Sequence, residues 1–276
     1  MEQQSAKVFD TKINYYTHGQ GQPLLFIHGH RSDALRWKGI ILFLGKKFKV
    51  YAPDLPGFGQ SPEFKNQPNT MSSYAKYMNE FVKKLNLKNY ILFGGSMGGI
   101  IALKMLIQKL KTPPVKLVLA GTPYDKKYWT ISFLNKILFF FGKNSKLFIS
   151  LAEKIINNDF LLYCLLYFSF PKEARKKEII KYEIKQWRVM SFKVWLETMI
   201  DTVEVSFSQE KFQTKIPTII LNAKGDQYFN AQKTAKGLKK LCPNNKIILL
   251  AFTSHVPKGE LKLKHLKEFQ SLLDLT

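Results

Sequence analysis

Six short apolar segments recur along the chain of 276 residues, and each is followed by glycine, proline or a polar side chain. They comprise residues 23–27, 48–52, 90–93, 115–120, 218–221 and 247–252. Nearly uninterrupted apolar runs of this length, bounded by turn-forming residues, are typical of β-strands that are buried on both faces. The pattern therefore predicts six strands in the interior of a sheet.

Between these segments the apolar positions follow a different period. In residues 70–85 they recur every three or four positions, as on one face of an α-helix. Residues 100–110, 231–241 and 261–273 are predicted to be helical as well. Because buried strands that alternate with helices form parallel sheets, we predict an α/β fold with a mostly parallel sheet and helices on both faces. Residues 7–17 predict a hairpin at one edge, which makes the sheet eight-stranded.

One region lacks this alternation. From about residue 125 to residue 211 the sequence predicts several helices rich in Phe, Tyr, Trp and Leu, with 139–141 and 161–170 the most apolar parts. We interpret residues 125–211 as a helical cap, or lid, inserted into a core of residues 1–124 and 212–276. Open α/β sheets place their sites at the carboxyl ends of the strands, so we expect the insertion to lie above that edge.

The sequence Gly94-x-Ser96-x-Gly98 lies between the predicted strand 90–93 and the predicted helix 100–110. A serine nucleophile needs an exposed hydroxyl on a sharp turn, and small residues two positions away on each side let strand and helix approach. The position therefore predicts that Ser96 is a nucleophile. The alternative is a glycine-rich turn that only packs the helix on the strand.

A second candidate lies upstream, where the strand 23–27 ends in His28-Gly29-His30. Backbone N–H groups just after such a strand can donate to an oxyanion, and we predict that those of His30 and Met97 form an oxyanion hole. The His30 imidazole would then be a wall of the site. For His28 we expect a structural role, with hydrogen bonds within its own loop.

Asp54 opens a tight loop after the strand 48–52, with the sequence Asp-Leu-Pro-Gly-Phe-Gly-Gln-Ser. Its place after a strand would also suit a catalytic acid. We predict instead that its carboxylate accepts hydrogen bonds from loop amides, as aspartate does in turns.

Together, His28-Gly29, the loop 54–61 and the turn 94–99 resemble the α/β-hydrolase superfamily in order and spacing. The resemblance covers nearly the whole chain. It implies an α/β-hydrolase fold with a helical cap after the sixth strand, which matches residues 125–211, and a chain order of nucleophile, acid and histidine. Residues expected to support the site structurally are His28, Gly29, Gly94 and Gly98.

The same resemblance suggests the other two members of a catalytic triad. Asp226 follows the strand 218–221 through a short turn and resembles the family's acid, which accepts from the imidazole Nδ1–H and stabilises the imidazolium. Asp125, after the preceding strand, is the alternative acid, because some relatives place it there. His255 follows the last strand, where the family keeps the base that takes the proton of Ser96 and returns it to the leaving group.

Two departures from the family pattern bear on the site. Ser254 precedes His255, where the family often has glycine. His30 and Arg31 stand where many relatives carry an apolar residue, which leaves the shape of the acyl pocket open.

A serine nucleophile reduces the number of possible reactions, because relatives that open epoxides or displace halide use a carboxylate at this position. We expect hydrolysis of a small-molecule carboxylic ester through an acyl-enzyme, and the aromatic cap favours an apolar acyl or aromatic ester, with an acyl lipid or lysolipid as the substrate hypothesis. The alternatives are C–C bond hydrolysis of a dienone-type acid, cofactor-free peroxidation, and a ligand-binding protein that keeps the fold with slow or no turnover. No metal and no organic cofactor is expected.

The net charge of +23, from 43 Lys and Arg against 20 Asp and Glu, has three interpretations. The simplest is a solvated, lysine-rich surface. The second is attraction to acidic substrates or weak peripheral contact with an anionic membrane. Nucleic-acid binding is not expected, because the lysines are spread along the chain and no zinc-finger or aromatic RNA-binding signature is present.

The two cysteines, Cys164 and Cys242, show no CxxC or Cys/His spacing, so we expect neither a disulfide framework nor a zinc site, although one disulfide between them stays open. Residues 1–10 are polar and do not resemble a secretory signal. The longest apolar stretch, 160–170, is too short to span a bilayer. A cytoplasmic location is the expectation, and the sequence leaves the oligomeric state open.

Overall fold

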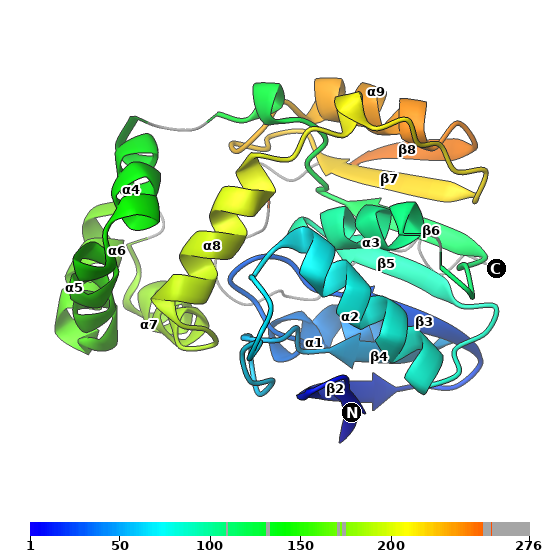
Figure 1. Ribbon diagram of the computed structural model, residues 1–276, viewed down its shortest axis with the longest axis horizontal. Coiled ribbons are helices and arrows are strands. Elements are labelled where there is room, and N and C mark those ends of the chain that lie inside the picture. The colour runs from blue at the N-terminus through cyan, green and yellow to red at the C-terminus, as the bar shows by residue number, and fades with distance from the viewer. Residues whose placement is uncertain (109, 131–132, 170–171, 173–174, 251–254, 256–276) are drawn as a thin grey trace.

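A single sheet of eight strands forms the centre of the molecule (Figure 1). The computed structural model describes residues 1–108, 110–130, 133–169, 172, 175–250 and 255, without the side chains of residues 133–137. In chain order the strands are β1 Glu2–Val8, β2 Thr11–His18, β3 Gln22–Ile27, β4 Phe48–Pro53, β5 Ile91–Gly95, β6 Lys116–Ala120, β7 Thr218–Ala223 and β8 Asn245–Leu250.

The strands are ordered β1-β2-β4-β3-β5-β6-β7-β8 across the sheet. Strands β3 to β8 pair in parallel, whereas β1 and β2 form an antiparallel hairpin that joins the edge of β4. The predicted mostly parallel, eight-stranded sheet is therefore confirmed. Parallel strands point their carboxyl ends to one edge, so the loops after them meet there.

Helices cover both faces of the sheet, as its apolar strands require. Helices α2 Met71–Lys84, α3 Met97–Ile107 and α9 Ala231–Leu241 pack on one face, and α1 Lys38–Leu44 packs on the other. Strand β3 shows how the two layers are filled, because successive side chains of a strand point to opposite faces. Leu25 and Ile27 belong to the cluster with α2 and α3, and Leu24 and Phe26 to the cluster with α1.

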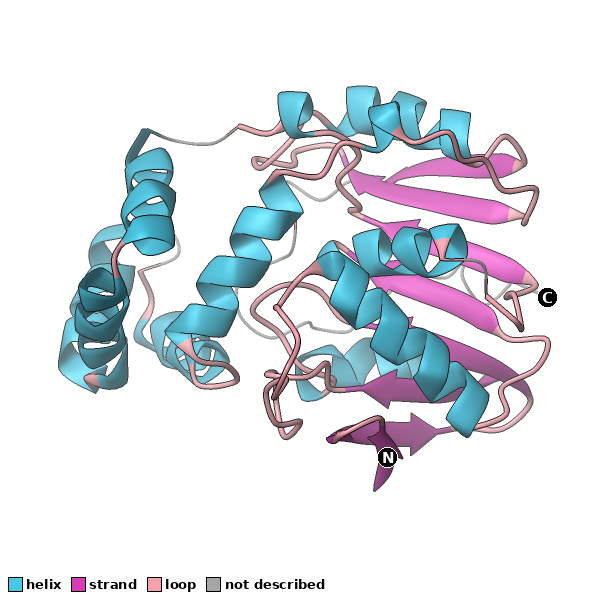
Figure 2. Ribbon diagram, viewed as in Figure 1, coloured by secondary structure: helices cyan, strands magenta, loops and turns pink. Residues whose placement is uncertain are grey.

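In the described part of the chain, five α-helices lie between β6 and β7; they are here called the inserted helices. They are α4 Phe133–Asn144, α5 Lys146–Asn157, α6 Asp159–Ser169, α7 Lys177–Trp187 and α8 Phe192–Val203. They lie beyond the carboxyl ends of the parallel strands, with α7 and α8 nearer the sheet than α4 to α6 (Figure 2). Residues such as Ile156, Leu162 and Leu196 give them an apolar core of their own. In the part of the chain that the structure describes, no helix has both the length and the apolar character needed to cross a membrane.

The elements differ from the expected ones in a few places. Helix α1 has only seven residues, too few to show a helical period in the sequence, and was not predicted. Strand β8 ends at Leu250, and the last two residues of the predicted strand 247–252 lie outside the described residues, as does the predicted helix 261–273.

Candidate active site

Ser96 occupies the turn between β5 and α3 in a backbone conformation that is rare for residues with a side chain. Its φ is 53° and its ψ is −117°, which is a strained combination for a non-glycine residue. The Ser96 N–H donates to the Ala120 carbonyl at 2.7 Å and holds the turn against β6. A Cβ on Gly94 would lie 2.5 Å from the Gly98 carbonyl oxygen, and one on Gly98 would collide with the Ile27 carbonyl oxygen. Both flanking glycines are therefore sterically required.

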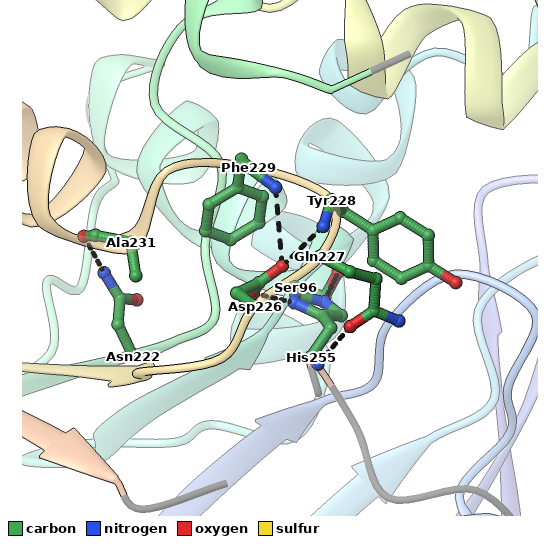
Figure 3. A network of polar contacts seen from close by, with 8 residues as sticks. All are labelled: Ser96, Asn222, Asp226, Gln227, Tyr228, Phe229, Ala231 and His255. Carbon is green, nitrogen blue, oxygen red and sulfur yellow. Dashed lines mark hydrogen bonds and ion pairs between the residues drawn. The ribbon is translucent and has the colours of Figure 1, made fainter. Parts of the chain in front are cut away.

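Ser96, His255 and Asp226 form one hydrogen-bonded chain, although they come from three distant segments (Figure 3). Ser96 Oγ lies 2.9 Å from His255 Nε2, and His255 Nδ1 lies 2.5 Å from Asp226 Oδ2. The histidine side chain is 9% exposed and the aspartate side chain 0%. When Nδ1–H donates to the carboxylate, Nε2 is left to accept the serine proton, which is the tautomer that a general base needs.

The turn after β7 orients both the acid and the imidazole. Asp226 Oδ1 accepts from the backbone N–H groups of Tyr228 at 2.9 Å and Phe229 at 3.4 Å. The rings of Tyr228 and Phe229 stand edge-on to the His255 ring, with centroids 5.5 and 5.4 Å away. Gln227 Oε1 accepts from the His255 N–H at 3.0 Å. Three consecutive residues, Gln227 to Phe229, therefore fix the geometry of the Asp226–His255 pair.

Gly121, at the carboxyl end of β6, supports His255 from the sheet. Its φ of 57° favours glycine, and a Cβ there would lie 2.9 Å from His255 Cε1. Any larger residue would push the imidazole away from Ser96.

Two backbone N–H groups close to Ser96, those of Met97 and His30, are candidates for binding an oxyanion. Gly29 brings the loop after β3 against the serine, since a Cβ on Gly29 would lie 3.1 Å from Ser96 Cβ. Met97 is the first residue of α3, so its N–H has no acceptor within the helix. The His30 N–H likewise donates to no other residue in the described part of the chain.

The side chains of His28 and His30 are used for structural contacts. His28 Nδ1–H donates to the Gly29 carbonyl at 2.8 Å, and its Nε2 accepts from the Leu55 N–H at 3.1 Å. His30 Nε2–H donates at 3.0 Å to the carbonyl of Trp195, which lies on α8. Burial lowers the pKa of each imidazole to about 4, so both are neutral at pH 7. His28 thus makes the bond within its loop that the sequence predicts, and His30 joins that loop to the inserted helices.

The Asp54 carboxylate accepts hydrogen bonds from loop amides, as predicted. Its Oδ1 accepts from the Ala34 N–H at 2.9 Å and its Oδ2 from the Gln60 N–H at 3.0 Å. Burial raises the pKa of this carboxyl to about 6, although the two hydrogen bonds act in the opposite direction.

Asp125, the alternative acid, is engaged elsewhere. It accepts from the Lys127 N–H at 3.1 Å, where it caps the short 3₁₀ helix Lys126–Tyr128, and from the Ser208 hydroxyl. The carboxylate that meets the His255 imidazole is that of Asp226.

A cavity of about 250 Å³ lies above Ser96 and His255. The loop after β3 supplies one wall with His30, Arg31 and Arg36, and the inserted helices supply another with Trp187, Trp195 and Met199. Many apolar side chains of the most apolar predicted segments, 139–141 and 161–170, lie away from this cavity. Leu162 and Leu166 pack within the inserted helices, and Phe141 and Phe168 are exposed.

Sequence reasoning missed several residues of this site. Gly121 and Gln227 follow strands at the carboxyl edge, and that position was the available signal for both. Arg36, Glu183 and Trp187 carried no such signal, because they meet only through the packing of α7 over the loop after β3.

Comparison with known sequences identifies the family. Residues 22–259 match the family described as the alpha/beta hydrolase fold. The chain belongs to this family. The predicted superfamily and fold are therefore confirmed.

Two curated relatives of this α/β hydrolase are hydrolases of different kinds. It is 26% identical over 272 residues to the pimeloyl-[acyl-carrier protein] methyl ester esterase of Legionella pneumophila (strain Lens), a match that covers 95% of this chain and 98% of that protein. It is 31% identical over 98 residues to haloalkane dehalogenase 2 of Mycobacterium tuberculosis (strain ATCC 25618 / H37Rv), but this match covers 36% of this chain and 34% of that protein. These relatives support a hydrolase activity.

Solved structures of esterases share the fold. The esterase RhEst1 from Rhodococcus sp. ECU1013 superposes with a TM-score of 0.75 at 18% identity, over 100% of this chain and 99% of that one. A thermophilic esterase from Thermogutta terrifontis gives a TM-score of 0.74 at 18% identity, over 99% and 98% of the two chains. At this level of identity the likeness extends to the fold alone.

Proposed function

We propose that this α/β hydrolase cleaves a small carboxylic ester through an acyl-enzyme formed on Ser96. The observation that carries the proposal is the hydrogen-bonded chain from Ser96 through His255 to Asp226 at the floor of a cavity. A serine hydroxyl becomes a nucleophile when an adjacent base can take its proton and a third group orients that base. Both conditions are supported, by the distance of 2.9 Å from Ser96 Oγ to His255 Nε2 and of 2.5 Å from His255 Nδ1 to Asp226 Oδ2.

In the first half of the reaction, Ser96 Oγ attacks the ester carbonyl while His255 Nε2 takes the hydroxyl proton. The carbonyl oxygen becomes an oxyanion, which the N–H groups of Met97 and His30 stabilise. The imidazolium, held by Asp226, then gives its proton to the departing alcohol, and the acyl group stays on Ser96.

In the second half, water replaces the alcohol. His255 takes a proton from the water, whose oxygen attacks the acyl carbon at the same oxyanion site. When the tetrahedral intermediate collapses, the proton returns to Ser96 Oγ and the carboxylic acid leaves. One ester and one water give one acid and one alcohol, and no cofactor takes part.

The size of the cavity favours a short acyl or aromatic ester. At about 250 Å³ it is smaller than the roughly 300–1,000 Å³ of typical ligand pockets. Four tryptophans, Trp37, Trp129, Trp187 and Trp195, line the cavity and supply apolar surface. A long acyl chain would exceed this space, so the cavity argues against a lipid-sized substrate. The full-length resemblance to a methyl ester esterase supports an ester bond as the target.

The test is a series of 4-nitrophenyl esters of increasing acyl length, assayed with the unaltered protein and with Ser96→Ala. We expect turnover of the short esters, a sharp decline beyond about eight acyl carbons, and loss of turnover in Ser96→Ala. If no ester is hydrolysed, or if Ser96→Ala is as active as the unaltered protein, the proposal is wrong. Faster cleavage of a dienone-type acid than of any ester would favour C–C hydrolysis instead.

A further inference from the structure

We propose that the cavity above Ser96 selects esters that carry a carboxylate, which Arg31 and Arg36 bind. The inference rests on the proposed function, because it names the substrate class of that same site. It also accounts for Arg31, a charged residue that directly follows His30 where an apolar acyl pocket would be expected to have an apolar side chain.

Arg31 and Arg36, which line the cavity, converge on the buried carboxylate of Glu183. Arg31 Nη2 lies 2.7 Å from Glu183 Oε2, and Arg36 Nη2 lies 3.3 Å from Glu183 Oε1. The side chains of Arg31, Arg36 and Glu183 are 20%, 9% and 0% exposed. Arginine keeps its charge in proteins, so two guanidinium groups share this carboxylate at the edge of the cavity. A second carboxylate, brought by the substrate, would meet a positive field there.

Three residues that line the cavity also carry buried hydrogen-bond donors that have no acceptor in the described part of the chain. Arg36 Nη1, Trp129 Nε1 and Trp187 Nε1 are buried and have no hydrogen-bond partner in the described part of the chain. All three residues line the cavity. Buried donors are costly when unpaired, and each of these atoms can only donate. A carboxylate has two oxygens that only accept, so it is the complement that these atoms lack.

Aromatic rings hold the two guanidinium groups in place before any ligand arrives. The Arg31 guanidinium lies 5.1 Å from the centre of the Trp187 ring, and that of Arg36 lies 5.4 Å from the centre of the Tyr182 ring. Stacking on an aromatic face restrains a guanidinium and leaves its edge free for hydrogen bonds. The site therefore needs little ordering when it binds an anion.

The small cavity limits where the carboxylate can sit in the substrate. Arg31 directly follows His30, whose N–H is one of the two donors proposed for the oxyanion. A single small molecule must therefore bring its scissile carbonyl and its carboxylate close together in about 250 Å³. This favours half-esters of short dicarboxylic acids, or short esters of a hydroxy acid.

The experiment compares pairs of esters that differ by one carboxylate group. On the acyl side, the mono-4-nitrophenyl ester of adipic acid is compared with 4-nitrophenyl hexanoate; on the alcohol side, 4-acetoxybenzoate is compared with phenyl acetate. We expect kcat/KM to be about 10-fold or more higher for the charged ester on one side, the effect of a charge-assisted hydrogen bond. The side that shows the preference locates the carboxylate. Ratios at or below one on both sides would overturn the inference.

Substitutions then assign the preference to residues. In Arg31→Gln and Arg36→Gln, the loss of kcat/KM for the charged ester should exceed the loss for its neutral partner by about 10-fold or more. Arg36→Lys keeps the charge and should keep part of the preference. Lys193→Gln removes one exposed positive charge from α8 and should leave the ratio unchanged. Equal falls of the ratio in Lys193→Gln and Arg36→Gln would show a general effect of net charge and overturn the assignment.

The unaltered protein gives a measurement that does not depend on the folding of variants. Adipate should inhibit hydrolysis of 4-nitrophenyl acetate at concentrations at least about tenfold lower than hexane-1,6-diol does. Equal inhibition would contradict the inference. If neutral esters are hydrolysed without any preference for charge, only this inference fails, whereas absence of all ester hydrolysis refutes the proposed function itself.

From a separate observation we infer that the outer side of α5 and α6 docks on an anionic membrane surface. Six apolar side chains there, here called the α5–α6 stripe, are between 43% and 74% exposed. They are Leu147, Leu151, Ile155, Leu161, Leu165 and Phe168. Their spacings of three and four residues place them along one side of each helix. An apolar groove lined by Ile155, Leu161, Leu165 and Phe168 joins the two rows.

The charges around the stripe favour lipid over a second copy of this chain. The exposed lysines near it are Lys143, Lys146, Lys154 and Lys172. The nearby exposed Asp159 is paired with Arg188 at 2.6 Å. Apolar side chains that have an excess of exposed lysines beside them in the chain suit a surface of anionic headgroups, whereas two copies would bring like charges together.

Co-sedimentation with phosphatidylcholine vesicles, with and without phosphatidylglycerol, tests the docking surface. We expect binding to the anionic vesicles at low salt, weaker binding at high salt, and a loss of about tenfold or more in Leu165→Ser/Phe168→Ser. Phe9→Ser/Val115→Ser removes two exposed apolar side chains elsewhere and should bind as the unaltered protein does. Absence of binding at low salt, or equal losses in the two variants, would overturn the inference. So would sedimentation velocity that shows a stripe-dependent dimer without vesicle binding.

Discussion

The carboxyl edge of the sheet and the inserted helices meet at one cavity but are built on different principles. At the sheet edge, Ser96, His255 and Asp226 are bonded to one another at 2.9 and 2.5 Å, and the turn after β7 fixes them further. Where the loop after β3 meets the inserted helices, Arg36 of that loop and Trp187 of α7 keep buried donors that have no partner in the described part of the chain. The difference suggests that the sheet edge supplies the reaction, whereas the opposite wall is left incomplete for a substrate.

The largest expected effect tests the sheet edge. His255→Gln and Asp226→Asn should each lower kcat by about 10⁴-fold for every ester, because the base is lost or its tautomer is no longer fixed. Steady-state kinetics with a charged and a neutral ester measures both. Asp125→Asn should stay within about threefold of the unaltered protein, because a general base is oriented only by the group that bonds it. If Asp125→Asn were inactive and Asp226→Asn active, the assignment of the acid would be wrong.

Loss of the contact between the two regions should lower the free energy of unfolding. Glu183 of α7 holds Arg31 and Arg36, so Glu183→Gln leaves two buried cations without their carboxylate and should lower the free energy of unfolding by about 3 kcal/mol. Urea unfolding followed by circular dichroism provides the value. Glu178→Gln, an exposed change on the same helix, should be close to neutral. Equal effects of the two substitutions would show that the ion pairs do not join the regions.

Gly121→Ala should lower kcat with little change in KM. The added Cβ would lie 2.9 Å from His255 Cε1 and would displace the base. A misplacement of a catalytic group by about 1 Å can lower the rate by about 10²-fold. Gly21→Ala is the matched control, because Gly21 also has a positive φ, of 97°, but lies away from the site. Both variants should lose some stability, and only Gly121→Ala should lose activity. Equal kinetics in the two would mean that His255 tolerates displacement.

Acid should lower the free energy of unfolding through the two histidines of the loop that joins the two regions. The pKa values of His28 and His30 are about 4 when folded, below the ordinary 6.5, so the unfolded chain binds more protons between these values. The free energy of unfolding should therefore fall as the pH drops below 6.5, by up to about 1.4 kcal/mol per pH unit for each histidine. Asp54, whose pKa is raised to about 6, opposes the fall below that pH. Urea unfolding at pH 7.5, 6.5 and 5.5 measures the slope.

His30→Gln separates the contributions to this slope. Glutamine can still donate to the Trp195 carbonyl but does not titrate, so the variant should show a shallower fall with pH than the unaltered protein. An unchanged slope would assign the pH dependence to other groups.

The two regions also differ in how far their structure follows from the sequence. Strands and turns are local features, so the apolar runs predicted the sheet, and Ser96, Asp226 and His255 could be named from their places after strands. The inserted helices are different, because aromatic residues occupy both their inner and outer sides: Trp195 lines the cavity, whereas Phe160 and Phe168 are exposed. The contact of Arg36 with Glu183 spans 147 positions and depends on how α7 packs, which no local pattern encodes.

Labelling with a fluorophosphonate probe tests the central claim most directly, because the probe forms a covalent bond only with an activated serine. The unaltered protein should be labelled at Ser96, as identified by mass spectrometry of the peptide, and Ser96→Ala should not be labelled. Asp226→Asn should be labelled far more slowly than Asp125→Asn. Labelling that persists in Ser96→Ala, or absence of labelling in the unaltered protein, would contradict the account.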